Sequence, residues 1–257
     1  MSINRRTLLK GAASAAGVTV LPFPLRADGH SPHEFDTGKG PLKVLPIRHA
    51  SIVLQTPAGT IYVDPVGDPI LYSGLPPADL ILVTHHHGDH FNAETLGALI
   101  ASGNSPKLVT NPEVMGKLPS DLASGATSLA NGDGTKAMDV PIDAIPAYNL
   151  TADRQKFHPK GRDNGYVFRV GDFKIYVSGD TEDIPEMRGL ADVDLAFVCM
   201  NLPFTMDATA AASAVAEFKP KYVYPYHFRG RDGGTQDPKE FAALVGDASD
   251  VRMGSWY

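Results

Sequence analysis

Residues 84–90 read Thr-His-His-His-Gly-Asp-His, and this stretch constrains the possible folds more than any other part of the chain. The run Asp79–Thr84 before it is mostly apolar and has the length of a buried strand. The cluster is therefore expected on a loop that leaves a strand end. Imidazole nitrogens and carboxylate oxygens are ligands of divalent cations, so His85, His87, Asp89 and His90 are predicted metal ligands.

The spacing within this stretch predicts two cation sites. His85 and His87 alternate, so in an extended loop their side chains point the same way. Asp89 and His90 are adjacent and diverge, which favours a second cation beside the first. His86 faces away from its neighbours and is assigned to packing or to support of the ligands.

Two later segments follow strand-like runs and carry the same residue types, Ser178-Gly179-Asp180-Thr181 and Tyr226-His227. Together with His-x-His-x-Asp-His, and in the same order, they resemble the signature of the metallo-β-lactamase-fold hydrolases. The resemblance extends from about residue 42 to the C-terminus and is closest to the lactonase-like and phosphodiesterase-like branch. It implies an α/β fold, a four-layer αββα sandwich, for a single domain over residues 41–257.

The resemblance also implies a chemistry for these residues. His85 and His87 would hold one divalent cation, Asp89, His90 and His227 a second, and Asp180 would bridge the two. Zinc is the default metal, with manganese or iron as alternatives. A shared hydroxide would attack a carbonyl carbon or phosphorus, and Asp89 is the candidate catalytic residue that orients it or passes its proton.

The third ligand of the first cation is open at this stage. The family usually has a histidine at the end of the strand expected over 142–148, where this chain has Tyr148-Asn149. Either His158 returns to the site as the third ligand, or Asn149 or a water completes it.

Other residues are expected to support the ligands or to touch substrate. Arg48-His49-Ala50-Ser51 resembles a Gly-His-Ala-Ser segment of the family, so His49 either lies near the cations and substrate or is a structural histidine. Asp64 ends the strand 60–64 and is expected to hold the ligand loop from behind, with a simple turn before proline as the alternative.

The run 192–199 is expected to be a buried strand, and the loop after it is a candidate wall of the cleft. Asn201, Phe204 and Met206 are the candidate lining residues on this loop. Cys199 lies inside the apolar run and is expected in the core rather than at a metal.

The remaining pattern predicts alternating strands and helices. Asn92, Asp207 and Asp237 are predicted helix N-caps, and Gly103 is the predicted end of the first helix. Strands are expected over 42–48, 51–56, 60–64, 107–110, 135–140, 142–148, 165–170, 173–178 and 221–224, and helices over 92–102, from 111, 207–218 and 238–245.

The N-terminus carries a targeting signal rather than part of the fold. Asn4-Arg5-Arg6-Thr7-Leu8-Leu9-Lys10 is a twin-arginine motif, and the short apolar stretch Gly11–Leu21 follows it. Residues 1–27 are predicted to be a twin-arginine signal peptide, which implies a periplasmic protein without stable membrane insertion after cleavage. A disordered basic tail is the alternative. Residues 28–40 are expected to be a linker, with His30 and His33 exposed.

Composition narrows the function. The chain has 257 residues, a formal net charge of −6 and one cysteine, which disfavours nucleic acid as a partner and excludes an internal disulfide. The prediction is a metal-dependent hydrolase for an ester, lactone, amide or phosphodiester bond of a small or lipid-derived molecule. A non-catalytic periplasmic metal-binding protein is the alternative. A di-iron oxidoreductase is disfavoured, because those relatives carry Glu where His87 stands.

Overall fold

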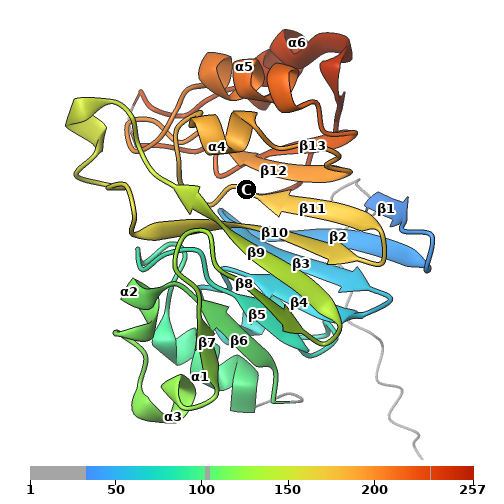
Figure 1. Cartoon of the computed structure of the whole chain (residues 1–257), viewed down its shortest axis with the longest axis vertical. Coiled ribbons are helices and arrows are strands. Elements are labelled where there is room, and N and C mark those ends of the chain that lie inside the picture. Colours follow the sequence, from blue (N-terminus) through green and yellow to red (C-terminus); the bar gives the residue numbers. More distant parts are fainter. Residues whose placement is uncertain (1–32, 102–104, 232) are drawn as a thin grey trace, which may run out of the picture. The chain divides into compact units, whose positions relative to one another are not determined.

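The N-terminal half of the chain forms a mixed sheet whose seven strands lie side by side in the order of the sequence (Figure 1). The structure is a computed structural model that describes residues 33–101, 105–231 and 233–257. Strands β1 to β4 pair antiparallel, and β4 to β7 pair parallel. Their bounds are β1 (His33–Asp36), β2 (Pro41–Arg48), β3 (Ser51–Thr56), β4 (Gly59–Val63), β5 (Leu80–Leu82), β6 (Lys107–Thr110) and β7 (Ala126–Ser128).

The C-terminal half repeats this plan in a second seven-stranded sheet. Strands β8 to β11 pair antiparallel, and β11 to β14 pair parallel. Their bounds are β8 (Gly134–Ala137), β9 (Val140–Ala147), β10 (Asp163–Val170), β11 (Phe173–Val177), β12 (Leu195–Cys199), β13 (Tyr222–Tyr226) and β14 (Asp250–Val251).

Helices occur where parallel neighbours require a crossover. Figure 1 shows α1 to α3 beside the first sheet and α4 to α6 on the far side of the second. The four-layer αββα sandwich predicted from the sequence is thereby confirmed. The helices are α1 (Ala93–Ala101), α2 (Pro112–Met115), α3 (Ser120–Ala123), α4 (Pro185–Arg188), α5 (Ala208–Phe218) and α6 (Pro238–Val245), with 3₁₀ turns η1 (Pro69–Tyr72), η2 (Ala152–Arg154) and η3 (Gly246–Ala248).

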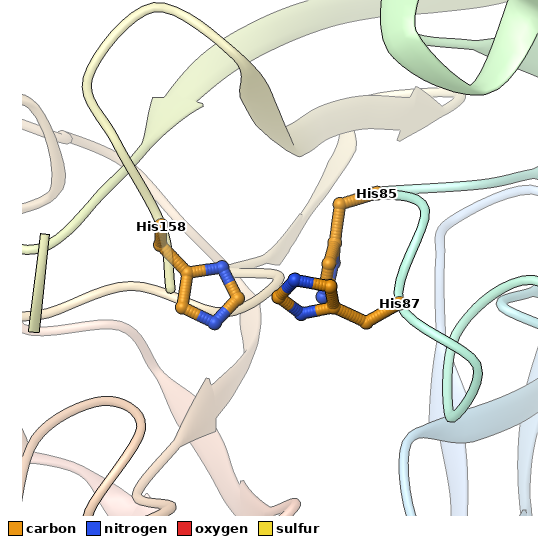
Figure 2. Close-up of side chains that lie close together, drawn as sticks. All are labelled: His85, His87 and His158. Atoms are coloured by element: carbon orange, nitrogen blue, oxygen red, sulfur yellow. The ribbon is translucent and has the colours of Figure 1, made fainter. Parts of the chain in front are cut away.

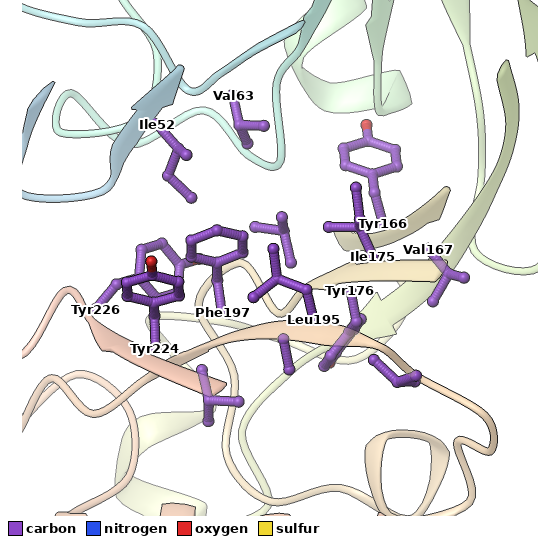
Figure 3. Close-up of a cluster of buried hydrophobic side chains, with 14 of the residues drawn as sticks. Ile52, Val63, Tyr166, Val167, Ile175, Tyr176, Leu195, Phe197, Tyr224 and Tyr226 are labelled. Carbon is purple, nitrogen blue, oxygen red and sulfur yellow. The ribbon is translucent and has the colours of Figure 1, made fainter. Parts of the chain in front are cut away.

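Aromatic and branched side chains fill the space between the sheets (Figure 3). Ile52 and Val63 of the first sheet point toward Phe197, Tyr224 and Tyr226 of the second. Phe197 lies opposite Tyr224 in the β12–β13 register, and their rings stack with centroids 5.1 Å apart. A second apolar cluster lies between the first sheet and α1, which explains why the strands of this sheet are apolar on both faces.

The predicted helix starts are confirmed by hydrogen bonds of their caps. Asn92 accepts from the backbone N–H of Thr95, and Asp207 accepts from that of Ala210. Asp237 caps α6 in the same way, through the N–H of Lys239. Gly103, the predicted end of the first helix, lies outside the described residues.

The predicted linker is wrong for residues 33–36. These residues form β1, which pairs antiparallel with β2 and extends the first sheet by one edge strand. His33 is correspondingly half-buried, and its Nδ1 lies beside the hydroxyl of Tyr224 instead of facing solvent. The polar composition hid this strand because only Phe35 turns inward. The predicted signal peptide (1–27) and His30 lie outside the described residues.

Several predicted boundaries shift by a few residues. The expected strand 135–140 ends at Ala137, because Met138 and Asp139 turn with positive φ and lead into β9. Two short edge strands, β7 and β14, have no alternating pattern and were not predicted. In the described part of the chain, no helix is long and apolar enough to cross a lipid bilayer.

Truncating Phe197 tests the packing between the sheets. Phe197→Ala should lower the free energy of unfolding by about 3–5 kcal/mol, because the side chain is fully buried and leaves a cavity. Phe197→Leu should cost less than half of that, and Ile70→Ser, at a side chain 68% exposed, should cost almost nothing. Urea unfolding with an unchanged m-value is the measurement. Equal losses for Phe197→Ala and Ile70→Ser would contradict the assigned core.

Candidate metal centre

The candidate site lies where several strands of both sheets end. Asp64 directly follows β4 and Asp180 closely follows β11. Asn201 and His227 closely follow β12 and β13, and the histidine-rich loop follows β5. The carboxyl ends of parallel strands meet at one edge of a sheet, so these residues gather there although they are far apart in the sequence.

Three imidazoles form the first group of this site. His85, His87 and His158 have ring nitrogens within 4.8 Å of one another. Figure 2 shows the rings facing each other, with His158 reaching in from a separate loop. The ring centroid of His158 lies 5.0 Å from that of His85 and 4.8 Å from that of His87. A cation of moderate radius fits between three nitrogens in this arrangement.

Asn149 anchors the loop of His158 through its side-chain nitrogen, while its Oδ1 is buried without a hydrogen-bond partner. Its side-chain amide donates to the backbone carbonyls of Arg154 and Phe204, at 2.9 and 2.7 Å. Its backbone N–H donates to the carbonyl of His158. The structure thus brings His158 beside His85 and His87, and the Asn149 N–H groups fasten the loop that carries His158.

The carboxylate of Asp180 stands between two sets of imidazoles. Its Oδ1 lies 3.3 Å from Nε2 of His90 and 3.4 Å from Nε2 of His227. Its Oδ2 lies 3.4 Å from Nε2 of His158 and 4.0 Å from Nε2 of His85. The two oxygens thus face different nitrogens, as a carboxylate shared by two cations requires.

Gly179 lets Asp180 take this position. Its φ is +62°, and a Cβ there would lie 2.6 Å from the carbonyl oxygen of Asn164. Any larger residue would push the two strand ends apart and displace the carboxylate that follows.

The remaining group contains His49, Asp89 and His227. Oδ2 of Asp89 lies 3.3 Å from Nε2 of His49 and 3.4 Å from Nε2 of His227. The hydroxyl of Tyr257 lies 2.7 Å from Nδ1 of His49 and fixes the other side of that ring. Asp89, His90 and His227 were predicted to hold the second cation together. In the structure, Asp89 and His227 group with His49, whereas His90 groups with His85 and Asp180.

Buried carboxylates hold two of these imidazoles from behind. Asp64 lies 2.8 Å from Nδ1 of His90 and also accepts the N–H and hydroxyl of Thr84. Asp163 lies 3.0 Å from Nδ1 of His158. A carboxylate on Nδ1 fixes the ring and directs Nε2 toward the site. Asp64 was expected in this place, but Asp163 was missed because nothing in its sequence neighbourhood marks a partner for His158.

Burial lowers the pKa of three imidazoles. It lowers the pKa of His85 well below the ordinary 6.5, and the charge of His90 acts in the same direction. Burial also lowers the pKa of His87 to about 4 and that of His227 below 6.5. These rings are neutral near pH 7 and offer a lone pair to a cation.

At the other titratable groups, neighbouring charged or hydrogen-bonding partners outweigh burial in setting the pKa. Burial alone lowers the pKa of His90 and His158, but Asp180 together with Asp64 or Asp163 outweighs it and raises both. Burial raises the pKa of Asp180 and Asp89, yet neighbouring imidazoles hold the pKa of each carboxyl well below its usual range. Both aspartates are therefore anionic in the site.

Unpaired polar atoms test whether a metal suits these residues. Nε2 of His85, His90 and His158 and Oδ1 of Asp180 are buried without a hydrogen-bond partner. An unpaired buried polar atom costs about 1–3 kcal/mol, so four in one place call for a shared partner. Neutral nitrogen and carboxylate oxygen are the donors that divalent zinc, manganese or iron accept, and the residues therefore fit such ions.

A cavity of about 490 Å³ opens onto these groups. Its size is that of a site for a small molecule. The predicted cleft residues Asn201 and Phe204 line it, whereas Met206 is buried in the core and was predicted wrongly. The full lining is His49, His87, Asp89, Phe157, His158, Asp180, Asn201, Phe204, Arg229, Gly230 and Arg231.

Two further predictions concern residues near the site. His86 is half-buried and belongs to none of the three groups, as expected. Cys199 is fully buried, its thiol donates to the carbonyl of Thr181, and burial raises its pKa to about 12. The cysteine is a core residue, as its place in the apolar strand indicated.

Glu182 fastens the loop that delivers His158. Its carboxylate is almost fully buried and accepts the backbone N–H groups of Leu150 and Thr151, both at 2.7 Å. It also accepts from Nη1 of Arg154 at 2.9 Å. Burial raises the pKa of Glu182, but these donors lower it overall, so the anionic carboxylate is the form that holds the loop.

Removing this carboxylate should loosen the loop. Glu182→Ala leaves the buried donors of Leu150 and Thr151 without an acceptor, so the free energy of unfolding should fall by about 1–3 kcal/mol. Amide hydrogen exchange should accelerate over residues 149–158. Glu113→Gln, which breaks a surface ion pair with Lys117, is the matched control and should change neither quantity. Unaltered exchange in Glu182→Ala would show that other contacts hold the loop.

Comparisons with known proteins agree with this geometry. The model of the family described as "Beta-lactamase superfamily domain" matches residues 44–227. A UPF0173 metal-dependent hydrolase of Anaeromyxobacter dehalogenans is 33% identical over 226 residues, 80% of this chain and 81% of the relative. Another from Thermococcus onnurineus is 34% identical and spans 68% of this chain and 77% of its own.

Solved structures of similar fold include proteins named as metal-dependent hydrolases. A crystal structure from Parabacteroides distasonis, of a protein named for metal-dependent hydrolysis, has a TM-score of 0.78 and 36% identity. It covers 88% of this chain and 99% of its own. The metallo hydrolase Igni18 from Ignicoccus hospitalis shares the fold, with a TM-score of 0.69 at 22% identity over 82% of this chain and 94% of its own.

Proposed function

Since the chain belongs to the UPF0173 metal-dependent hydrolases of the beta-lactamase superfamily, we propose that it hydrolyses an ester, lactone, amide or phosphodiester bond of a small or lipid-derived molecule. One observation carries the proposal above all. The unpaired nitrogens of His85, His90 and His158 converge on the Asp180 carboxylate at the wall of a cavity of small-molecule size.

We assign the ligands by the oxygen of Asp180 that they face. His85 and His158 lie on the Oδ2 side, together with His87, and would hold one cation. His90 and His227 lie on the Oδ1 side and would hold a second, with Asp89 beside His227. Zinc suits this imidazole-rich set best, and manganese or iron suits its oxygens too.

When bound, such cations lower the pKa of water to roughly 7 and polarise the bond under attack. The chain supplies the remaining functions. The ionised Asp89 lies on the cavity wall and orients a water or accepts its proton, so it is the proposed catalytic residue. Asn201, whose amide lies 3.4 Å from Nε2 of His227, donates to substrate or steadies that ring. Asp64 and Asp163 keep their histidines aimed.

Metal loading and a substrate panel test the proposal. Protein loaded with zinc, manganese or iron should hydrolyse at least one of a set of esters, lactones, amides and phosphodiesters, and a chelator should stop it reversibly. His87→Ala and Asp180→Ala should each lower kcat/KM at least about a hundredfold, because even residues that only support ligands cost ten- to a hundredfold.

His86→Ala is the matched control, because His86 neighbours the ligands without joining a group, and it should keep activity and metal content. Full activity in metal-depleted protein would refute the assignment. Full metal content without turnover on any panel member would instead favour a non-catalytic metal-binding protein.

We also propose that the protein is exported to the periplasm through the twin-arginine pathway. The support is the Arg5-Arg6 pair followed by a short, weakly apolar stretch. Arg5→Lys combined with Arg6→Lys should retain the protein in the cytoplasm with its N-terminal segment uncleaved. Cell fractionation measures this, with Lys10→Arg as the control that keeps the positive charge. Normal export of the double variant would overturn the proposal.

A further inference from the structure

Two arginine side chains at the cavity lie apart from the carboxylates that the structure describes. Arg229 and Arg231 follow the ligand His227 on one loop, and both line the cavity. Within residues 33–101, 105–231 and 233–257, neither guanidinium contacts a carboxylate, although other arginines such as Arg169 and Arg252 do. In this acidic protein, two cations at the wall of one cavity without a described carboxylate beside them are a feature that the hydrolytic chemistry does not use.

Aromatic rings hold both guanidinium groups in place. The guanidinium carbon of Arg229 lies 4.2 Å from the ring centroid of Tyr257, and that of Arg231 lies 5.6 Å from that of Phe204. Stacking on a ring limits the orientations of a guanidinium but leaves its N–H donors free. The two groups are therefore preorganised and still able to bind an anion.

The backbone of their loop is also fixed. A Cβ on Gly230 would lie 1.9 Å from the carbonyl oxygen of Leu202, so only glycine fits between the two loops. The N–H of Gln236 donates to the carbonyl of Phe228, and the N–H of Gly234 donates to that of Arg231. These contacts anchor the loop against the segment that carries Phe204.

The cavity wall between the arginines and the metal ligands includes an apolar part. Phe157 and Phe204 both line it and meet edge to face, with ring centroids 5.0 Å apart. Phe157 precedes His158 directly, so the aromatic pair lies beside the first group of ligands. One cavity thus offers metal ligands, an aromatic surface and two cations.

We propose that the substrate carries an anionic group, a carboxylate or a phosphate, joined through an apolar portion to the bond that is cleaved. Arg229 and Arg231 bind the anion through charge-assisted hydrogen bonds, and Phe157 and Phe204 contact the apolar portion. The cavity volume restricts the ligand to a small molecule. This inference rests on the proposed hydrolytic function for the cleaved bond, but the anion site itself is measurable by binding alone.

Binding of matched probes tests the site. Metal-loaded protein is titrated calorimetrically with 4-phenylbutyrate, with 3-phenylpropylphosphonate and with the neutral 4-phenylbutyramide. Arg229→Gln and Arg231→Gln should each weaken binding of at least one anion about tenfold or more, because each removes a charge-assisted hydrogen bond. The amide should lose far less. The anion with the larger loss identifies carboxylate or phosphate as the recognised group.

Two control variants separate the contribution of apolar contact to binding from that of the arginine charges. Phe157→Ala should weaken the anions and the amide by similar factors, since it removes apolar contact from all three, whereas the rings stacked on the guanidinium groups are those of Tyr257 and Phe204. Arg169→Gln removes a half-buried arginine away from the cavity and should change nothing. The proposal is overturned if both arginine variants bind the anions as the unaltered protein does, because the anions would then be held by the metal ions alone.

The same titration distinguishes this inference from the function on which it rests. Arginine-dependent anion binding without hydrolysis of any panel compound would reject the hydrolytic function and leave the anion site standing. Turnover of neutral panel members, with anions bound independently of Arg229 and Arg231, would reject the anion site and leave the hydrolytic function standing.

Discussion

The placement of one buried carboxylate, that of Asp180, determines how the rest of the site is organised. Removing an ionised carboxylate from water costs several kcal/mol unless opposite charges or hydrogen bonds compensate. Here the compensation comes from imidazoles on both sides, each within about 4 Å of one of its oxygens. The arrangement exists only because strands of both sheets end at the same place, and Gly179 allows their backbones to approach closely.

The imidazoles around Asp180 form two sets whose pKa values are shifted in opposite directions. Burial keeps His85, His87 and His227 neutral, while Asp180, together with the carboxylates behind His90 and His158, favours the protonated forms of these two. The free polar atoms left in the centre are destabilising for the protein alone. The fold therefore maintains a locally unfavourable arrangement through contacts made elsewhere, which is a common property of functional sites.

Local patterns predicted much of the fold and of the site. Periodicity predicted the strand before His85, and cap chemistry predicted the caps Asp207 and Asp237. The αββα layers were predicted from the family resemblance. The edge strand β1 was not predicted, because a half-exposed strand with one inward-facing residue has no alternating apolar pattern. The place of His158 and the partner role of Asp163 depend on how the polar segment 149–164 folds back toward the site. Glu182 and Asn149 set the path of this segment through long-range hydrogen bonds.

The order of strands in the two sheets has a consequence for assembly of the protein. Within each sheet, every strand pairs with its neighbours in the sequence, so either half can form its own ladder without contacts from the other half. The histidine loop 85–90 belongs to the first half, whereas His158, Asp180 and His227 belong to the second. A cation held by both sets would add its binding free energy to the docking of the two halves, so the stability of the folded protein is expected to rise with metal concentration.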